Sequence, residues 1–203
     1  MTANAAVVAG QPISVQEVDN RESRLRASTP VASLPLAGTS EGRQLRRWLT
    51  QLIVTERVVA FEAARLGVTA AAAPGLKEVL PEGTARHELG SVTAAVLADP
   101  VARALFAYVT EYVEVDNEDV AAYHFRNPTR FAGSAPGPGG WRVRTPPPSL
   151  QQARPVITAH LLGSARRRAF RTWLDSRRAT LVELAPGFEH PGDPRQPDNT
   201  HKH

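Results

Sequence analysis

Residues 190–203, HPGDPRQPDNTHKH, combine imidazole and carboxylate side chains in one short segment. Three of the six histidines lie there, together with two aspartates. Zinc and iron bind imidazole and carboxylate together. His201 and His203 are two residues apart and therefore point the same way in an extended chain. If a proline-rich turn brings His190 and Asp193 to the same ion, the segment supplies four ligands for zinc or iron(II): His190, Asp193, His201 and His203.

Two other interpretations of this segment stay open. Its prolines and its scarcity of apolar residues are equally typical of a disordered tail or of a tail that docks on a partner. The spacing of the histidines matches no common zinc signature. In a third interpretation the segment has a structural role and packs back on the body of the protein through Phe188.

Histidine is also the side chain best suited to proton transfer near neutral pH. We therefore take His190, His201 and His160 as candidate catalytic residues. His160 lies near the apolar stripe of the last long helix, where the tail can reach it, although a histidine at the edge of the core fits the same pattern. The chain contains no GxSxG, P-loop or GxGxxG motif in a suitable context.

The overall composition is that of an ordinary soluble globular protein, with 42% hydrophobic and 22% charged residues over a length of 203. There is no cysteine, which excludes disulfides, thiolate metal sites and a cysteine nucleophile. The first residues lack the basic and apolar regions of a signal peptide. No run approaches the roughly 18 apolar residues of a membrane span. We therefore expect a cytoplasmic protein without a membrane partner.

The net charge of +4 comes almost entirely from arginine, because only Lys77 and Lys202 are lysines. The densest basic run is residues 166–168, followed by Arg171, Arg177 and Arg178. On a helix these side chains spread around the axis, which indicates a solvated face. An acidic carrier protein or another polyanion is the alternative partner. Nucleic acid ranks last because base-stacking motifs are absent.

Helical periodicity and capping signals dominate the first half of the chain. Ser14 and Glu17 form a capping-box pattern that predicts a helix to about residue 27. The clearest apolar stripe predicts a helix over residues 40–66, with Ser40 as N-cap and Gly67 as its left-handed C-terminal residue.

The second half contains shorter helices and one further long one. Residues 132–149 are rich in proline and glycine and predict a loop or linker, with a short strand at residues 141–144. The long helix is predicted at residues 150–184, beginning near residue 153 because proline is tolerated only in the first turn. Helices are further predicted at residues 86–97, 100–109 and 116–126.

The order of these segments resembles one family. AGQPISVQEVDNRE looks like the opening of SurA-type and PrsA-type foldases, and RQLRRWLTQLIVTERVVAFEAARLGV is similar to their next helix. EVDNEDVAAYHFRNPTRFAG resembles the stretch that leads into their parvulin isomerase domain. VITAHLLGSARRRAFRTWLDSRRATLVEL is like their C-terminal helix. The similarity covers roughly residues 6–67, 110–145 and 156–184.

This resemblance implies a mostly α fold, in which a long C-terminal helix packs back on the N-terminal helices. Only WRVRTPPPSLQQARPV stands where the family has its parvulin domain, so we expect no prolyl isomerase activity. The prediction is one helical domain over residues 1–186 and an irregular tail over residues 187–203. Exchange of the last helix between two copies, giving a homodimer, stays open.

The sequence therefore predicts a SurA-like scaffold that serves small-molecule metabolism as an enzyme or accessory protein. A groove between the two long helices, lined by Trp48, Phe170 and Trp173, is expected to hold an apolar or carrier-linked substrate. The tail, with zinc, iron(II) or no cofactor, is expected to close over it. The rival interpretation is a non-enzymatic chaperone whose groove binds unfolded peptide.

Overall fold

The computed structural model describes residues 3–30, 33–81, 83–136, 142–144 and 146–192. Contacts divide the chain into two compact units. The first unit contains the described residues of Met1–Val109 and Phe170–His203, and the second contains those of Thr110–Ala169. One long helix, α8 (Leu150–Leu181), contributes residues to both units. The single domain predicted over residues 1–186 stays a prediction.

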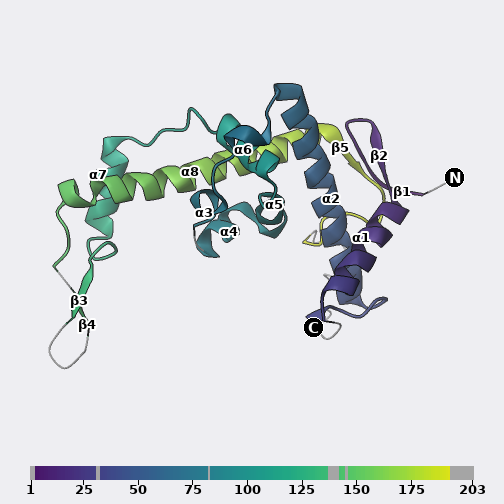
Figure 1. Cartoon of the computed structure of the whole chain (residues 1–203), viewed down its shortest axis with the longest axis horizontal. Helices are drawn as coiled ribbons and strands as arrows, with labels where there is room; N and C mark the ends of the chain where they lie inside the picture. Colours follow the sequence, from purple (N-terminus) through teal and green to yellow (C-terminus); the bar gives the residue numbers. More distant parts are fainter. Residues whose placement is uncertain (1–2, 31–32, 82, 137–141, 145, 193–203) are drawn as a thin grey trace. The chain divides into compact units, whose positions relative to one another are not determined.

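The chain is mostly α-helical, as its sequence predicts, and ends its longest helix in the first unit (Figure 1). The other helices of this unit are α1 (Val15–Ser28), α2 (Ser40–Leu66), α3 (Leu76–Val79), α4 (Gly83–Leu89), α5 (Ser91–Val96) and α6 (Pro100–Val109), with a 3-10 turn at Ala70–Ala72.

The predicted caps of α1 and α2 are largely confirmed. The backbone N–H of Glu17 donates to the Ser14 side chain over 3.1 Å, which satisfies one open donor of the first turn. Gly67 adopts φ 69° at the end of α2, a left-handed conformation that costs glycine little. The N-cap of α2 is Thr39 and not the predicted Ser40, because the Thr39 hydroxyl accepts from the N–H of Gly42.

A small antiparallel sheet joins the two ends of the first unit. Its strand order is β2 (Gln11–Ser14), β1 (Asn4–Val8) and β5 (Val182–Leu184). Ala9 and Gly10 form the two-residue turn between β1 and β2, and both have positive φ, as the right-handed twist of a hairpin requires. The helix predicted over residues 150–184 is thus wrong at its end. The last three residues leave α8 and pair with β1.

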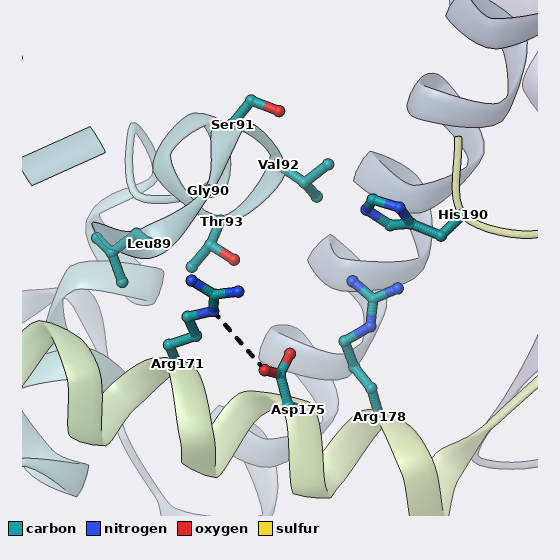
Figure 2. A pocket seen from close by; sticks show the side chains of 9 residues that line it. All are labelled: Leu89, Gly90, Ser91, Val92, Thr93, Arg171, Asp175, Arg178 and His190. Atoms are coloured by element: carbon teal, nitrogen blue, oxygen red, sulfur yellow. Dashed lines mark ion pairs between the residues drawn. The ribbon is translucent and has the colours of Figure 1, made fainter. Parts of the chain in front are cut away.

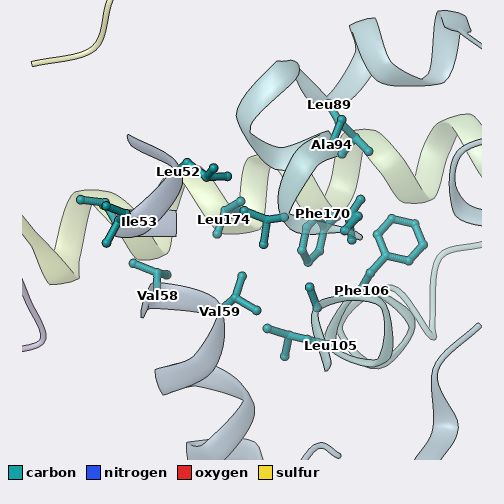
Figure 3. Packing of buried hydrophobic residues seen from close by; sticks show 14 of the residues in the cluster. Leu52, Ile53, Val58, Val59, Leu89, Ala94, Leu105, Phe106, Phe170 and Leu174 are labelled. Atoms are coloured by element: carbon teal, nitrogen blue, oxygen red, sulfur yellow. The ribbon is translucent and has the colours of Figure 1, made fainter. Parts of the chain in front are cut away.

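The core of the first unit forms where α8 meets α2 and the short helices. Phe170 and Leu174 of α8 are each 1% exposed, and Figure 3 shows them among residues of α2, α4, α5 and α6. Phe170 packs edge-on against Phe106 with ring centroids 5.2 Å apart, and it stacks on Trp173 at 5.7 Å. The packing of the C-terminal helix against the N-terminal helices is therefore confirmed.

The helix predicted over residues 86–97 is two helices. Gly90 has φ 82°, which interrupts the helical backbone between α4 and α5. Its own N–H still donates to the carbonyl of Arg86 and so closes the last turn of α4. The break turns residues 89–93 into a short corner instead of a continuous cylinder.

The second unit contains α7 (Asn117–Arg126), a hairpin of β3 (Ser134–Pro136) and β4 (Arg142–Arg144), and the first part of α8. The strand β4 confirms the short strand predicted there. The helix α8 begins at Leu150 and not near residue 153. Ser149 and Gln152 cap one another through backbone and side chain, which stabilises a turn ahead of Pro155.

Candidate functional site

The start of the tail is docked on α2. Gln51 is fully buried and donates from Nε2 to the carbonyl of Phe188 over 3.0 Å. Buried Arg47 donates from Nε to the carbonyl of Gly187 over 3.2 Å. The guanidinium of Arg46 lies 5.9 Å from the centroid of the Phe188 ring, a cation–π contact. This agrees with the interpretation in which the tail packs back through Phe188.

This docking places His190 at the edge of a hollow of about 460 Å³, which we call the His190 hollow (Figure 2). All of its lining residues belong to the first unit. They come from the corner between α4 and α5, from the last part of α8 and from the tail: Leu89, Gly90, Ser91, Val92, Thr93, Arg171, Asp175, Arg178 and His190.

Arg178 is the most deeply buried cation of this hollow. Its guanidinium donates to the Thr55 hydroxyl over 2.8 Å and to Oε1 of Gln51. Both acceptors are neutral. Burial lowers the pKa of the Arg178 guanidinium, and the charge of Asp175 acts in the opposite direction. An arginine still keeps its proton near neutral pH. The wall of the hollow therefore carries a positive charge whose described hydrogen-bond acceptors are uncharged.

Arg171 and Asp175 lie one helical turn apart on the same side of α8. Their ion pair has an N–O distance of 3.9 Å, and both side chains are more than half exposed. Arg171 also donates to the carbonyl of Glu88 over 3.2 Å. A pair so exposed and so long contributes little to stability. With Arg178, the face carries two guanidinium groups and one carboxylate, an excess of one positive charge.

The hydrogen bond to His190 fixes which ring nitrogen can donate. The backbone N–H of Gly192 donates to Nδ1 over 3.0 Å, so Nδ1 is an acceptor without a proton. In the neutral ring the proton is then on Nε2. A protonated Nε2 donates to a ligand and does not bind a metal ion. Metal binding by His190 through Nε2 therefore requires the loss of the bond to Gly192.

The corner between α4 and α5 adds hydroxyl groups to the same hollow. Thr93 is 8% exposed, and Figure 2 shows its side chain on the side of Arg171. Ser91 accepts a hydrogen bond of 3.1 Å from the indole N–H of Trp48. Because Gly90 breaks the helix here, both side chains stand at the hollow.

The groove predicted between the two long helices is crossed by polar contacts. Glu62 of α2 is 0% exposed, and its Oε1 accepts from Nε and an NH2 group of Arg177 on α8 at 2.8 and 2.6 Å. Its Oε2 accepts from Arg65 at 3.0 and 2.7 Å. Of the predicted groove residues, Phe170 lies in the core with 1% exposure, and Trp173 packs half-buried against it.

Trp48, the third predicted groove residue, lines a second and more apolar hollow of about 400 Å³. We call it the Trp48 hollow, and it lies between α1 and α2 in the first unit. Its walls are Arg21, Arg24, Leu25, Ser28, Trp48, Leu49 and Leu52.

The remaining predicted site residues are not gathered at the His190 hollow. His160 belongs to the second unit, where its Nε2 lies 3.2 Å from the hydroxyl of Tyr123 and its ring packs near Phe131. Asp193, His201 and His203 lie outside the described residues. Within the described ranges, no group of three or more metal-type side chains could hold an ion.

Metal binding by the tail stays a prediction with a direct check. The sequence predicts near-stoichiometric zinc or iron in the untagged full chain and its loss from a chain that ends at Gly192. That chain keeps His190 and the docked residues, so it isolates the contribution of Asp193, His201 and His203. Elemental analysis of both chains is the measurement. Equal metal content in the two chains would contradict the predicted ligand set.

Sequence reasoning missed Arg171, Arg178, Ser91 and Thr93. A signal for the first two exists, because Arg171, Asp175 and Arg178 are spaced by four and three residues and so share one helix face. The pattern is typical of a solvated face, and only the fold shows that the corner at Gly90 and the tail enclose it.

Comparisons with known proteins cover a small part of the chain. A family model described as "Family of unknown function (DUF7158)" matches residues 4–41, which span β1, β2, α1 and the first residues of α2. No curated protein and no solved structure matches the sequence. Among the helices that the structure describes, none has both the length and the apolar character needed to cross a membrane.

Proposed function

We propose that this protein is a helical binding scaffold that takes a small molecule into the His190 hollow and is not a prolyl isomerase. The observation that carries the proposal is the position of His190. A residue of the tail stands at the same hollow as Arg171 and Arg178 of α8 and Thr93 of α5. Four polar groups from three separate segments converge there.

The size and chemistry of the hollow suit this role. Small-molecule sites in proteins typically have volumes of about 300–1,000 Å³ and a few convergent polar groups. The His190 hollow has about 460 Å³ and combines such groups with the apolar side chains of Leu89 and Val92. Its walls rest on the buried core of the first unit, which favours a preformed site.

The resemblance to SurA-type foldases supports the negative half of the proposal. In that family the isomerase active site belongs to the parvulin domain, and the segment 132–149 is too short to contain one. The described part of this segment includes only the three-residue strands β3 and β4 and the connection to α8. The helical module remains, and binding is the activity that such a module offers.

Tail truncation tests the proposal, because the docked residues hold His190 at the hollow. We compare the full chain with chains that end at Gly192 and at Pro186, using thermal unfolding with and without a library of anionic, neutral and cationic small molecules. The expected result is a ligand-dependent rise in Tm for the full chain and for the chain ending at Gly192. The rise should be lost in the chain ending at Pro186, which lacks His190.

Two outcomes would count against small-molecule binding at this place. Either no compound raises the Tm of the full chain, or the chain ending at Pro186 responds equally. The variant Phe188→Ala is a useful intermediate, since it keeps His190 but removes the ring that packs against Arg46. Its response should fall between those of the two truncated chains.

A peptide-binding chaperone is the second candidate, and the Trp48 hollow favours it. Leu25, Leu49 and Leu52 form an apolar surface beside the Trp48 ring, flanked by the guanidinium groups of Arg21 and Arg24. Such a surface suits an apolar side chain of an extended peptide. If this candidate is correct, unfolded peptides raise the Tm of all three chains, and Leu25→Asp removes the effect.

A further inference from the structure

Resting on the proposed function, we infer that the ligand of the His190 hollow is a small oxyanion, bound through a carboxylate or phosphoryl group by Arg178, Arg171 and His190. The inference concerns the charge of the ligand and starts from the charges of the site. Two guanidinium groups and one carboxylate line the hollow.

Arg178 provides the strongest reason. A buried cation is costly unless an anion compensates it. The hydroxyl of Thr55 and the amide oxygen of Gln51 satisfy part of its hydrogen-bonding capacity but none of its charge. An oxyanion in the hollow would supply the missing negative charge, and the planar guanidinium fork matches the geometry of carboxylate and phosphate.

The other polar groups of the hollow can donate to the same anion. With Nδ1 of His190 occupied by the N–H of Gly192, the ring presents its Nε2 proton. The hydroxyl of Thr93 is a further donor at the opposite wall. Figure 2 shows the side chains of Arg178 and His190 close to each other on one side of the hollow and those of Arg171 and Thr93 on the other.

Asp175 limits the ligand that the site accepts. Its carboxylate lies between the two arginines on α8 and pairs with Arg171, so it opposes the approach of an anion. A cation is disfavoured more strongly, because it would meet two guanidinium groups. Removing the charge of Asp175 without changing its size should therefore tighten the binding of an anion.

Calorimetric titration of the full chain at constant ionic strength tests the inference. The probes are inorganic phosphate and succinate as oxyanions, glucose as a neutral compound and spermidine as a cation. The expected result is saturable binding of at least one oxyanion and no binding of glucose or spermidine. Binding of phosphate alone would assign a phosphoryl group to the natural ligand, and binding of succinate alone would assign a carboxylate.

Variants locate the binding. Arg171→Gln removes one charge from an exposed side chain and should weaken oxyanion binding about tenfold, the usual size of one charge-assisted hydrogen bond. Arg178→Gln should abolish binding, and Asp175→Asn should tighten it. His190→Gln, which keeps a donor, should bind better than His190→Ala. Arg86→Gln removes the same charge from an exposed position of α4 that does not line the hollow and should have no effect.

The failure of the inference differs from the failure of the proposed function. If library compounds that need His190 prove to be neutral or cationic, the hollow binds a small molecule and the oxyanion assignment is overturned. If oxyanions bind with equal affinity to the wild type, Arg171→Gln and Asp175→Asn, their site lies elsewhere and the inference is also overturned. If no compound of any class responds to loss of His190, the proposed function itself fails.

Discussion

Replacing Phe170 by alanine is expected to lower the free energy of unfolding of the first unit by about 3–5 kcal/mol. The ring is 1% exposed and packs against Phe106 and Trp173. Its removal leaves a cavity where α8 meets the other helices, and this position does not allow the neighbouring side chains to close it. Urea denaturation followed by tryptophan fluorescence gives the difference, since Trp173 lies in the same contact.

The matched control is Phe61→Ala on α2, whose ring is 41% exposed. Its loss should cost less than about 1 kcal/mol, because most of that apolar surface is in contact with solvent in the folded protein as well. A small effect of Phe170→Ala, similar to that of the control, would mean that Phe170 lines an open groove. In that case the interpretation of residue 170 as a substrate contact would return.

Replacing Glu62 by glutamine is expected to destabilise the first unit by about 3 kcal/mol, a typical cost of breaking a buried ion pair on one side. Glu62 is fully buried and holds Arg177 of α8 and Arg65 of α2. Glutamine has nearly the same shape but leaves both guanidinium groups without their countercharge. The free energy of unfolding at neutral pH is the quantity to measure.

The same carboxylate predicts a pH dependence. Burial raises the pKa of Glu62, but the hydrogen bonds and charges of Arg65 and Arg177 outweigh it, and the pKa lies below its usual value of 4.5. The carboxylate therefore stabilises the fold fully above pH 4.5, and this contribution is lost as the pH falls through the lowered pKa of the folded state. Stability of the wild type should fall more steeply below pH 4.5 than that of Glu62→Gln.

Glu56→Gln is the control for both measurements. Glu56 lies on the same helix and pairs with Arg21 over 2.7 Å, but its side chain is 38% exposed. An exposed pair contributes about 1 kcal/mol or less. If the two variants have equal stability at neutral pH, the contacts between Glu62 and Arg177 do not hold α8 against α2.

The helices follow closely from the sequence because their signals are local. Asp116 caps α7 by accepting from the N–H of Asp119, and Pro100 begins α6, both as predicted. The helix α2 ends at Leu66 before a left-handed glycine, again where the pattern places it. Caps and apolar stripes act over three or four residues, so a single sequence suffices to read them.

The sheet and the helix break escaped prediction for different reasons. β5 exists only because Val182 and Leu184 find β1 at the other end of the chain, and no local pattern encodes a partner so distant in sequence. Gly90 carries a local signal, yet a single glycine inside an apolar stripe is compatible with a continuous helix. Its positive φ depends on how α4 and α5 pack.

The candidate site could be predicted only in part. His190 stands out because it begins a segment rich in histidine and proline, and it does line the described hollow. The arginines that complete the site resemble any solvated basic helix face in the sequence. Their role depends on tertiary contacts, in which Gln51 binds both Arg178 and the carbonyl of Phe188 and thereby ties the wall of the hollow to the tail.

The central claim is that a small molecule occupies the His190 hollow, and a ¹H–¹⁵N NMR titration tests it most directly. The full chain is titrated with the compound that raises its Tm most. The account predicts that the amides of Gly90, Ser91 and Thr93 and the imidazole of His190 shift along one saturation curve. If these signals stay in place while those of Leu25 and Ser28 at the Trp48 hollow move, the claim is contradicted and peptide binding takes its place.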